Sequence, residues 1–579
     1  MAVPGASTEL LKKIAAELSL LQPLLPTYLH VIASSLFPIY IGAHASLSRP
    51  SSAAAPVRSS FDSHRGQDDD AYGTDDDDAS RMEGFRPEDA IWVPLLAGLT
   101  LGSLYLLIKW LEDPSILNLL LTWYFSLFGV FSVGQLFGNT LTLMSSFVFP
   151  RAWSDGQTMW RRNSDQMMFA AEREGASSEA PAVKLSPLPG VLSSIALSSS
   201  VRRFLWRCCD MMLERWTLHI RAGGETLVKS RFGLNDVVGL VLGAGTVVAY
   251  NCLDKPWWLT NALGFGFCYT TLQLMSPATF WTGTMILTGL FLYDIYFVFF
   301  TPMMVLVAKS LDVPIKLLIP RPSGPDDDID VQALAMLGLG DIVLPGMMIG
   351  LALRFDLYLY YLRKQTRATR PAAASTEPSD PKGHPEVIKA KYLSTSGGWG
   401  ERFWTPSAAM SSSSSSSSSF PKPYFHAGIV GYISGMVVTL GVMQVTEHAQ
   451  PALLYLVPGV LGALWSTALL RGELGLMWAY SERSEDEGEH AGLAPISIFA
   501  KEPAKLAASA AMKAEDRSAV SRGSTPAPAR DEARPSNAAV RSHGREIFCC
   551  TITARATAPA CEVSDSVRVE ENPENTKST

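Results

Sequence analysis

Two aspartates lie inside apolar segments that are long enough to cross a lipid bilayer. Asp294 lies within residues 282–306, and Asp341 lies within residues 331–353. A helix of ~20 apolar residues, at ~1.5 Å each, spans the ~30 Å hydrocarbon core of a bilayer. Each Asp is about ten residues from the ends of its segment, so both are expected near mid-membrane depth. A carboxylate there costs ~2.5–3.5 kcal/mol on insertion scales and indicates a functional site.

The link between these two segments, residues 309–330, is short. It makes the two predicted helices antiparallel neighbours, so that Asp294 and Asp341 can face each other. Two carboxylates at close range cannot both be ionised, and they share a proton as one unit. Peptide hydrolysis needs one ionised carboxylate to take a proton from water and one protonated carboxyl to donate to the carbonyl oxygen. The pair therefore indicates an aspartyl dyad in a membrane.

The rest of the chain has the composition of a polytopic membrane protein. Hydrophobic residues make up 47% of the sequence and charged residues 18%. Besides the two segments above, apolar runs cover residues 20–43, 91–110, 116–150, 234–253, 257–275, 425–445 and 451–470. They predict an all-α fold of about nine transmembrane helices. The 7 cysteines form no spaced framework, so we expect no disulfide scaffold, no metal site and no cofactor.

Polar inserts divide the expected nine-helix domain, residues 1–480. Within it we expect an acidic disordered loop at 49–89, a basic loop at 151–231, the catalytic helix pair at 278–353 and a serine-rich loop at 364–423. Residues 481–579 are charged, aperiodic and rich in Ala, Ser and Pro, which predicts a disordered tail. The second basic loop is residues 354–422, which include the serine-rich loop and carry Arg363, Lys364, Arg367 and Arg370. The positive-inside rule places both basic loops and the tail in the cytosol and the N-terminus in the lumen.

Two short motifs accompany the aspartates. Gly338, Leu339 and Gly340 precede Asp341, and two glycines weaken a helix by ~1 kcal/mol each while letting another backbone approach. Such glycines are also common as a plain helix-packing face in membranes. Coupled to Tyr293-Asp294 one helix earlier, however, the Gly-x-Gly-Asp pattern is specific.

The second motif opens the last predicted helix with Gln450, Pro451, Ala452 and Leu453. Proline is commonplace at a first helical position, so this Pro can be a simple helix start. It can also mark irregular backbone whose free groups face a polar cavity, which is tolerated at membrane depth where protein or water satisfies those groups.

These motifs make the chain similar to signal peptide peptidase, an intramembrane aspartyl protease of the GxGD type. The resemblance is carried by YDIYFVFFTP from Tyr293, AMLGLGDIVLPG up to Gly346 and QPALLYLVP from Gln450. Presenilin shares the three motifs, but its corresponding helices run in the opposite orientation and its inter-helix loop is long. The short link at 309–330 therefore resembles signal peptide peptidase.

The resemblance implies a multi-pass enzyme of the endoplasmic reticulum membrane that cleaves signal peptide remnants and other type II membrane segments. By carry-over, Asp294 and Asp341 resemble the catalytic pair. The substrate-binding residues implied by the motifs are Tyr293, Gly338, Leu339, Gly340, Gln450, Pro451, Ala452 and Leu453. The expected partners are membrane-embedded peptides and the lipid bilayer. A homo-oligomer is compatible with the sequence, and no nucleic acid is expected.

A competing interpretation is a proton- or cation-coupled transporter or channel, because membrane carboxylates also serve ion pathways. It would favour inverted repeats between the two halves of the chain, and the sequence shows none. Asp236 lies at the edge of its apolar run, where an exposed helix-start role is expected rather than catalysis.

Overall fold

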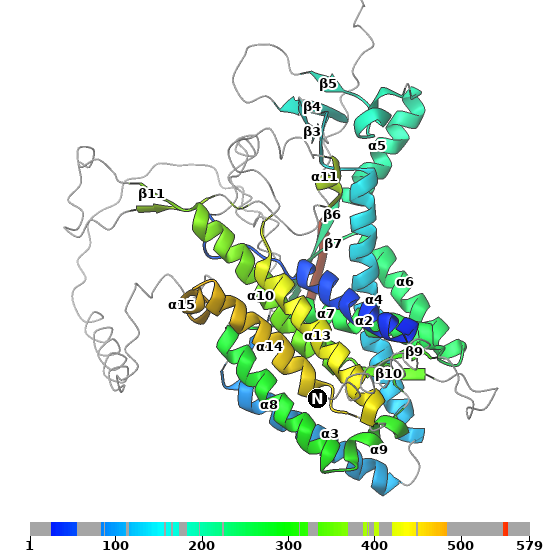
Figure 1. Ribbon diagram of the computed structural model, residues 1–579. Helices are drawn as coiled ribbons and strands as arrows, with labels where there is room; N and C mark the ends of the chain where they lie inside the picture. The colour runs from blue at the N-terminus through cyan, green and yellow to red at the C-terminus, as the bar shows by residue number, and fades with distance from the viewer. Residues whose placement is uncertain are drawn as a thin grey trace, which may run out of the picture. The chain divides into compact units, whose positions relative to one another are not determined.

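The computed structural model describes most of the helical body of the chain (Figure 1). The described residues are 25–54, 83–85, 87–111, 115–155, 158–163, 166–172, 182–195, 197–222, 225–311, 313–321, 334–368, 386–390, 392, 399–404, 420–446, 450–482 and 548–553. The serine run at 411–419 and most of the acidic loop and of the tail lie outside them. The chain divides into two compact units, one of residues 1–219, 228–482 and 550–579, the other of residues 220–227 and 483–549.

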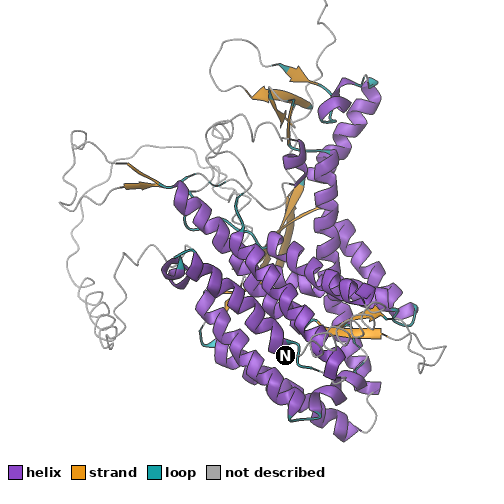
Figure 2. Cartoon of the chain, viewed as in Figure 1, coloured by secondary structure: helices purple, strands orange, loops and turns teal. Residues whose placement is uncertain are grey.

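Long helices form at all nine places where apolar runs predict them (Figure 2). They are α2 (Leu25–Ala45), α3 (Asp89–Leu111), α4 (Ser115–Val148), α6 (Leu234–Cys252), α7 (Trp257–Leu274), α8 (Phe280–Phe299), α10 (Gly340–Lys364), α13 (Pro423–Thr446) and α14 (Leu453–Leu470). Among the described residues, eight helices are long and apolar enough to cross a membrane. The ninth, α7, is long enough but carries more polar residues. The expected all-α polytopic membrane fold is confirmed.

Shorter elements connect these helices. The short helices are α5 (Ser199–Leu213), α9 (Met303–Ser310), α11 (Trp399–Trp404), α15 (Leu474–Ala479) and the 3-10 helix η1 (Gly190–Ser194). Two-stranded sheets pair β1 (Glu83–Phe85) with β8 (Met275–Pro277), β9 (Lys316–Pro320) with β10 (Leu334–Gly338) and β11 (Thr366–Ala368) with β12 (Glu386–Ile388). The remaining strands are β2 (Ala152–Ser154), β3 (Met159–Asn163), β4 (Met168–Glu172), β5 (Val183–Lys184), β6 (Arg215–Ala222), β7 (Glu225–Gly233) and β13 (Phe548–Thr553).

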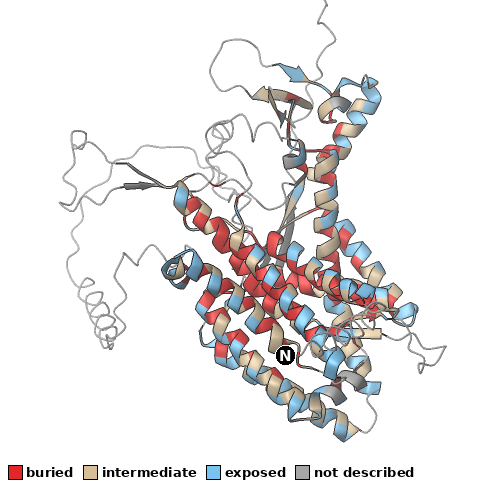
Figure 3. Cartoon of the chain, viewed as in Figure 1, coloured by how far each residue is buried: buried red, intermediate tan, exposed pale blue. Residues whose placement is uncertain are grey.

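The helix that carries Asp341 lies at the centre of the bundle. In the 18-residue apolar stretch of α10, 83% of the residues are buried, whereas the corresponding share is no more than 39% in any of the other seven candidate membrane spans. Figure 3 shows buried residues gathered along α10, which contacts α2, α7, α8, α13 and α14. The helices around it turn apolar residues outward, as expected for surfaces that face lipid.

Small residues allow two helix pairs to pack closely. A Cβ atom added to Gly239 of α6 would lie 2.4 Å from the backbone nitrogen of Gly138 in α4. A Cβ atom added to Gly431 of α13 would lie 2.4 Å from the carbonyl oxygen of Gly459 in α14. Neither approach leaves room for a side chain, which is the packing mode that membranes favour where no hydrophobic effect drives helices together.

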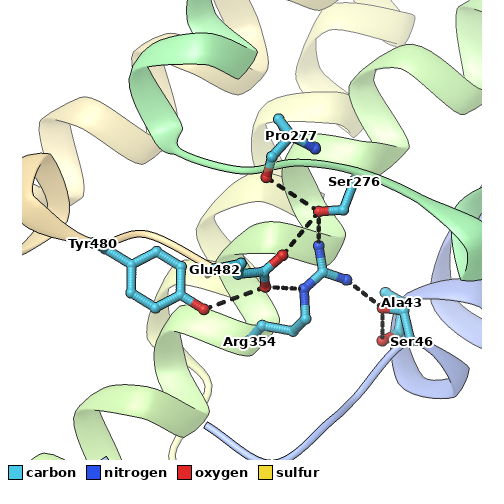
Figure 4. Close-up of polar contacts among 7 residues, drawn as sticks. All are labelled: Ala43, Ser46, Ser276, Pro277, Arg354, Tyr480 and Glu482. Carbon is cyan, nitrogen blue, oxygen red and sulfur yellow. Dashed lines mark hydrogen bonds and ion pairs between the residues drawn. The ribbon is translucent and has the colours of Figure 1, made fainter. Parts of the chain in front are cut away.

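A buried arginine in the second half of α10 forms hydrogen bonds to three other segments of the chain (Figure 4). Arg354 is 4% exposed, and its guanidinium donates to Ser46 Oγ at 2.6 Å, to Ser276 Oγ and to the Glu482 carboxylate. Ser276 Oγ donates to the second Glu482 oxygen at 3.1 Å, and Tyr480 donates to the first at 3.3 Å. The cluster joins α2, β8 and the end of the helical body around one charge.

The basic loop at 151–231 contains a small folded module that the sequence did not predict. Strands β2, β3, β4 and β5 form one antiparallel sheet in that order. Trp153, Trp160, Phe169 and Trp206 of α5 are buried together. The Lys184 ammonium lies 4.4 and 4.5 Å from the ring centroids of the first two tryptophans, where a cation interacts favourably with the π faces.

Candidate active site

The apolar segment around Asp294 is not one helix. Helix α8 ends at Phe299 and a separate helix, α9, begins at Met303, so the expectation of a single helix over 282–306 is wrong. Pro302 explains the break, because proline has no N–H to donate and disfavours helical backbone at the residue before it. Asp294 therefore lies near the carboxyl-terminal end of α8 rather than in the middle of its helix.

The segment around Asp341 also departs from the expectation of one helix. Residues 334–338 form β10, which pairs antiparallel with β9, and the helix begins only at Gly340. An apolar run of this kind cannot be assigned to helix or strand by periodicity alone. Here the partner strand decides, because Leu317 and Ile319 of β9 are fully buried and hold β10 alongside. Asp341 consequently lies in the first turn of α10.

These helix limits bring the two aspartates together at one end of the bundle. Helices α8 and α10 contact each other and both contact α14. Asp294, on α8, is 4% exposed. The fold thus places the two aspartates on contacting helices, as their positions in the sequence predicted.

The backbone that precedes α14 contributes a hydrogen-bond donor to the pair. The Leu453 N–H donates to Asp294 Oδ2 at 3.1 Å. Leu453 is the first residue of α14, where backbone N–H groups have no partner within the helix. Pro451 lies two residues before that start, so the alternative in which it occupies the first helical position does not hold. The interpretation in which free backbone groups face a polar site fits this geometry.

Neither glycine before Asp341 lies in a helix interior that it could weaken, because Gly338 belongs to β10 and Gly340 is the first residue of α10. Gly338 ends β10, and a Cβ atom there would lie 3.2 Å from Asp341 Oδ2. A Cβ atom at Gly340 would meet nothing within 4 Å. Leu339 between them points to α7, where its Cδ2 atom lies 3.2 Å from the place of a Cβ atom on Gly264. The backbone just before Asp341 therefore carries one side chain, that of Leu339, which packs against α7.

Two of the predicted substrate-binding residues turn elsewhere. The Tyr293 hydroxyl donates to the carbonyl oxygen of Ala97 in α3 at 3.5 Å. Gln450 donates to Thr446 Oγ1 at 3.0 Å in an exposed setting. The Tyr293 side chain therefore contacts α3 and the Gln450 side chain contacts the end of α13, while Ala452 occupies the N-cap position of α14 without a side-chain cap bond.

The structure adds a residue beside the pair that the motifs did not indicate. Tyr432 of α13 is fully buried, and its hydroxyl donates to the backbone carbonyl of Asp341 at 3.4 Å. The sequence gives no signal that distinguishes it, because Ser434 and Thr439 place hydroxyls in the same apolar run. Asp236 behaves as expected, since its exposed side chain accepts from the Gly233 N–H at 2.8 Å at the start of α6. Within the described part of the chain, no group of three or more His, Cys, Asp or Glu residues could hold a metal ion.

The sequence is similar to known proteins over much of its length. Residues 77–484 match the family model described as signal peptide peptidase. The chain is 32% identical over 265 residues to "Intramembrane protease 2" of Caenorhabditis elegans, which is 46% of this chain and 47% of the relative. It is 31% identical over 298 residues to the signal peptide peptidase of Mus musculus, with 50% and 63% covered. For the signal peptide peptidase of Homo sapiens the values are 27% over 400 residues, with 69% and 74% covered.

The matched segments span less than two thirds of the nematode and mouse relatives. The family model itself matches well over half of this chain and includes Asp294, Asp341 and Leu453. The chain belongs to the signal peptide peptidase family.

Proposed function

We propose that this protein is an intramembrane aspartyl endopeptidase in which Asp294 and Asp341 are the catalytic residues. The observation that carries the proposal is the placement of the two aspartates on contacting helices, α8 and α10, with the Leu453 N–H at the start of α14 bonded to Asp294. Two carboxyl groups at close range share one proton. The family relationship supports peptide hydrolysis over an ion pathway, and the relatives named above give no support to a transporter.

In the proposed reaction, the ionised carboxylate removes a proton from a water molecule as the water oxygen attacks the peptide carbonyl carbon. The protonated carboxyl gives its proton to the carbonyl oxygen, which forms a neutral tetrahedral diol. The diol then collapses as a proton passes to the amide nitrogen and the C–N bond breaks. The Leu453 N–H holds the Asp294 carboxylate in one orientation throughout.

The proposed substrates are signal peptide remnants, which the names of the mammalian relatives suggest, and other type II membrane segments, which the resemblance in the sequence motifs implies. A helical substrate hides its peptide bonds, and unwinding it in lipid exposes backbone groups that need partners. Strand β10 can supply them, because in the described part of the chain it pairs with β9 alone. Its free edge ends at Gly338, three residues before Asp341, so an extended substrate could pair with it by main-chain hydrogen bonds.

We further infer a location in the endoplasmic reticulum membrane, with the basic loops and the tail in the cytosol and the N-terminus in the lumen. The distribution of Lys and Arg supports this orientation. Cytosolic exposure would give the folded module around Trp153 and Trp206 an aqueous environment, which suits its charged surface strands.

The test is cleavage of a reporter signal peptide by purified enzyme in detergent. Asp294→Asn and Asp341→Asn keep the side-chain shape, and each alone should abolish hydrolysis without loss of the folded protein. Because the pair acts as a unit, the double variant should be no worse than either single one. The control is Asp236→Asn, which should retain activity because it caps a helix in an exposed position. Substantial turnover by either dyad variant would remove the aspartyl mechanism.

An active-site probe separates the two function classes directly. A transition-state analogue of peptide hydrolysis should bind the wild-type protein and lose affinity for both dyad variants. An ion pathway has no reason to bind such a compound.

A further inference from the structure

One buried side chain of α7 is bonded to the backbone of the hairpin that precedes Asp341. Asn261 is 5% exposed. Its Nδ2 donates to the carbonyl oxygen of Leu318 at 2.7 Å, and its Oδ1 accepts from the Leu318 N–H at 2.7 Å. Both hydrogen bonds go to the same residue of β9, which is the pattern that one strand residue makes with another across an antiparallel ladder.

The ladder itself explains why Leu318 needs this partner. Residues of antiparallel strands alternate between pairs that exchange hydrogen bonds and pairs whose backbone groups point outward. Leu318 is paired with Met336, and the Asn261 bonds show that the Leu318 groups point away from β10. By the same alternation Pro320 is outward-facing, where its missing N–H removes no bond to β10.

Asn261 therefore closes one edge of the hairpin and leaves the other open. A bare β9 edge buried among helices would leave an unsatisfied N–H and C=O, which is costly in a low-dielectric interior. The corresponding groups on the other side belong to Met336, whose side chain is 63% exposed. An added strand can pair only there, on the side of the hairpin that leads to Asp341.

The same face of α7 receives the hairpin by packing. Gly264 lies one turn after Asn261, and a Cβ atom there would lie 2.8 Å from Leu317 Cδ2 and 3.2 Å from Leu339 Cδ2. The Leu339 N–H donates to the Ile315 carbonyl at 3.1 Å and extends the ladder to the residue just before Gly340. Polar bonds at Asn261 and close packing at Gly264 thus fix β9, and through β9 the approach to Asp341.

We propose that Asn261 is a positioning residue that takes the place of a third strand, holding the hairpin so that Asp341 and a substrate paired with β10 are correctly aligned. Asn261 touches neither catalytic carboxyl in this role. It acts through β9 and Leu339, and its function rests on the protease activity proposed above.

The experiment uses the full-length protein with Asn261→Leu and Asn261→Ala. The Leu variant has a similar volume and loses both hydrogen bonds to Leu318, and the Ala variant loses them without adding bulk. Asp is avoided, because a buried, protonated carboxyl could make the same two bonds. The matched control is Asn251→Leu, because Asn251 is also a helix asparagine but bonds to Ser126 and to the carbonyl of Val247 in its own helix. Three readouts are taken: kcat and KM on the reporter, the cleavage positions by mass spectrometry, and amide hydrogen exchange.

We expect kcat to fall by between about tenfold and about 10²-fold in both Asn261 variants, the loss that a misplacement of up to ~1 Å produces. KM should change little, and the products should spread over neighbouring peptide bonds because the substrate is held less firmly. Exchange should rise in residues 316–320 and 334–338 while the other helices keep wild-type protection.

Wild-type kcat and a single cleavage position in Asn261→Leu would overturn the proposal. A uniform rise in exchange across the bundle would also overturn it, because Asn261 would then serve general stability. If Asn261→Leu does not fold, the Ala variant, which also loses both bonds, decides. If the wild-type protein and the Asn251→Leu control do not cleave the reporter, the proposed protease function fails, and the exchange data still test the hairpin role separately.

Discussion

The cluster around Arg354 predicts where the protein can be shortened without loss of stability. Glu482 supplies the one carboxylate that the buried guanidinium contacts among the described residues. The family match ends at residue 484, and the first compact unit breaks at Glu482. We therefore expect a sharp boundary: deletion of residues 483–579 should leave stability and cleavage largely intact, whereas deletion of residues 481–579 should not.

The size of the effect follows from burial. Removing one partner of a buried ion pair costs ~3–5 kcal/mol, because the other charge is left without compensation. Arg354 is 4% exposed, but the Glu482 side chain is 20% exposed, so we expect the lower end, about 3 kcal/mol. That loss lowers the ratio of folded to unfolded protein on the order of 10²-fold, since each 1.4 kcal/mol is about tenfold.

The assay is thermal denaturation of the detergent-solubilised protein, followed by the fraction that remains monodisperse. Full-length protein, the two deletions and the point variant Glu482→Gln are compared. Glu482→Gln keeps the chain length and removes only the charge, so it separates the ion pair from the rest of the segment. Unchanged stability in both Glu482→Gln and the longer deletion would refute the reasoning, because Arg354 would then need no carboxylate.

The remaining predictions concern packing, reactivity, substrate and topology. Gly431→Ala should destabilise the bundle by about 1–3 kcal/mol, because its Cβ would lie 2.4 Å from the Gly459 carbonyl, whereas Gly441→Ala meets nothing within 4 Å and should be neutral or stabilising. Burial raises the pKa of Cys209 in α5 to about 11, so this thiol stays protonated at pH 7–8 and should resist maleimide, while exposed Cys252 reacts in peptide mapping. Helix-breaking residues near the scissile bond should accelerate cleavage, because they lower the cost of extending the substrate. On sealed microsomes, protease added outside should cut an epitope placed in the serine-rich loop at 364–423.

Each of these four predictions can be contradicted by a specific result. Equal loss in the two glycine variants would show that close α13–α14 packing is not the cause. Rapid labelling of Cys209 at neutral pH would show that the tryptophan module, the folded unit of strands β2–β5 and α5 around Trp153 and Trp206, opens. Matched substrates whose cleavage ignores helix stability would count against extension at β10, and a protected serine-rich loop would reverse the proposed orientation.

Local features of the sequence were sufficient for the overall architecture. Apolar runs predicted the places of all nine long helices, because in a membrane the length and hydrophobicity of a segment nearly decide its structure. The role of Asp236 in the first turn of α6 was predictable for a similar reason, since the hydrogen bond between its carboxylate and the Gly233 N–H joins residues that are close in sequence. The motifs around Asp294, Asp341 and Leu453 also predicted which segments meet, although the catalytic roles of these residues remain proposals.

The tertiary structure decided what depends on distant partners. Residues 334–338 are apolar enough for a helix, and they become a strand because β9 lies beside them and Asn261, on α7, satisfies the β9 edge. The tryptophan module is assembled by residues that no local periodicity connects. Arg354 finds its carboxylate 128 residues later, in a segment that reads as part of a polar tail. Such pairs are invisible in the sequence because a buried polar group is satisfied by whatever the fold brings to it, and only the packed bundle determines which group that is.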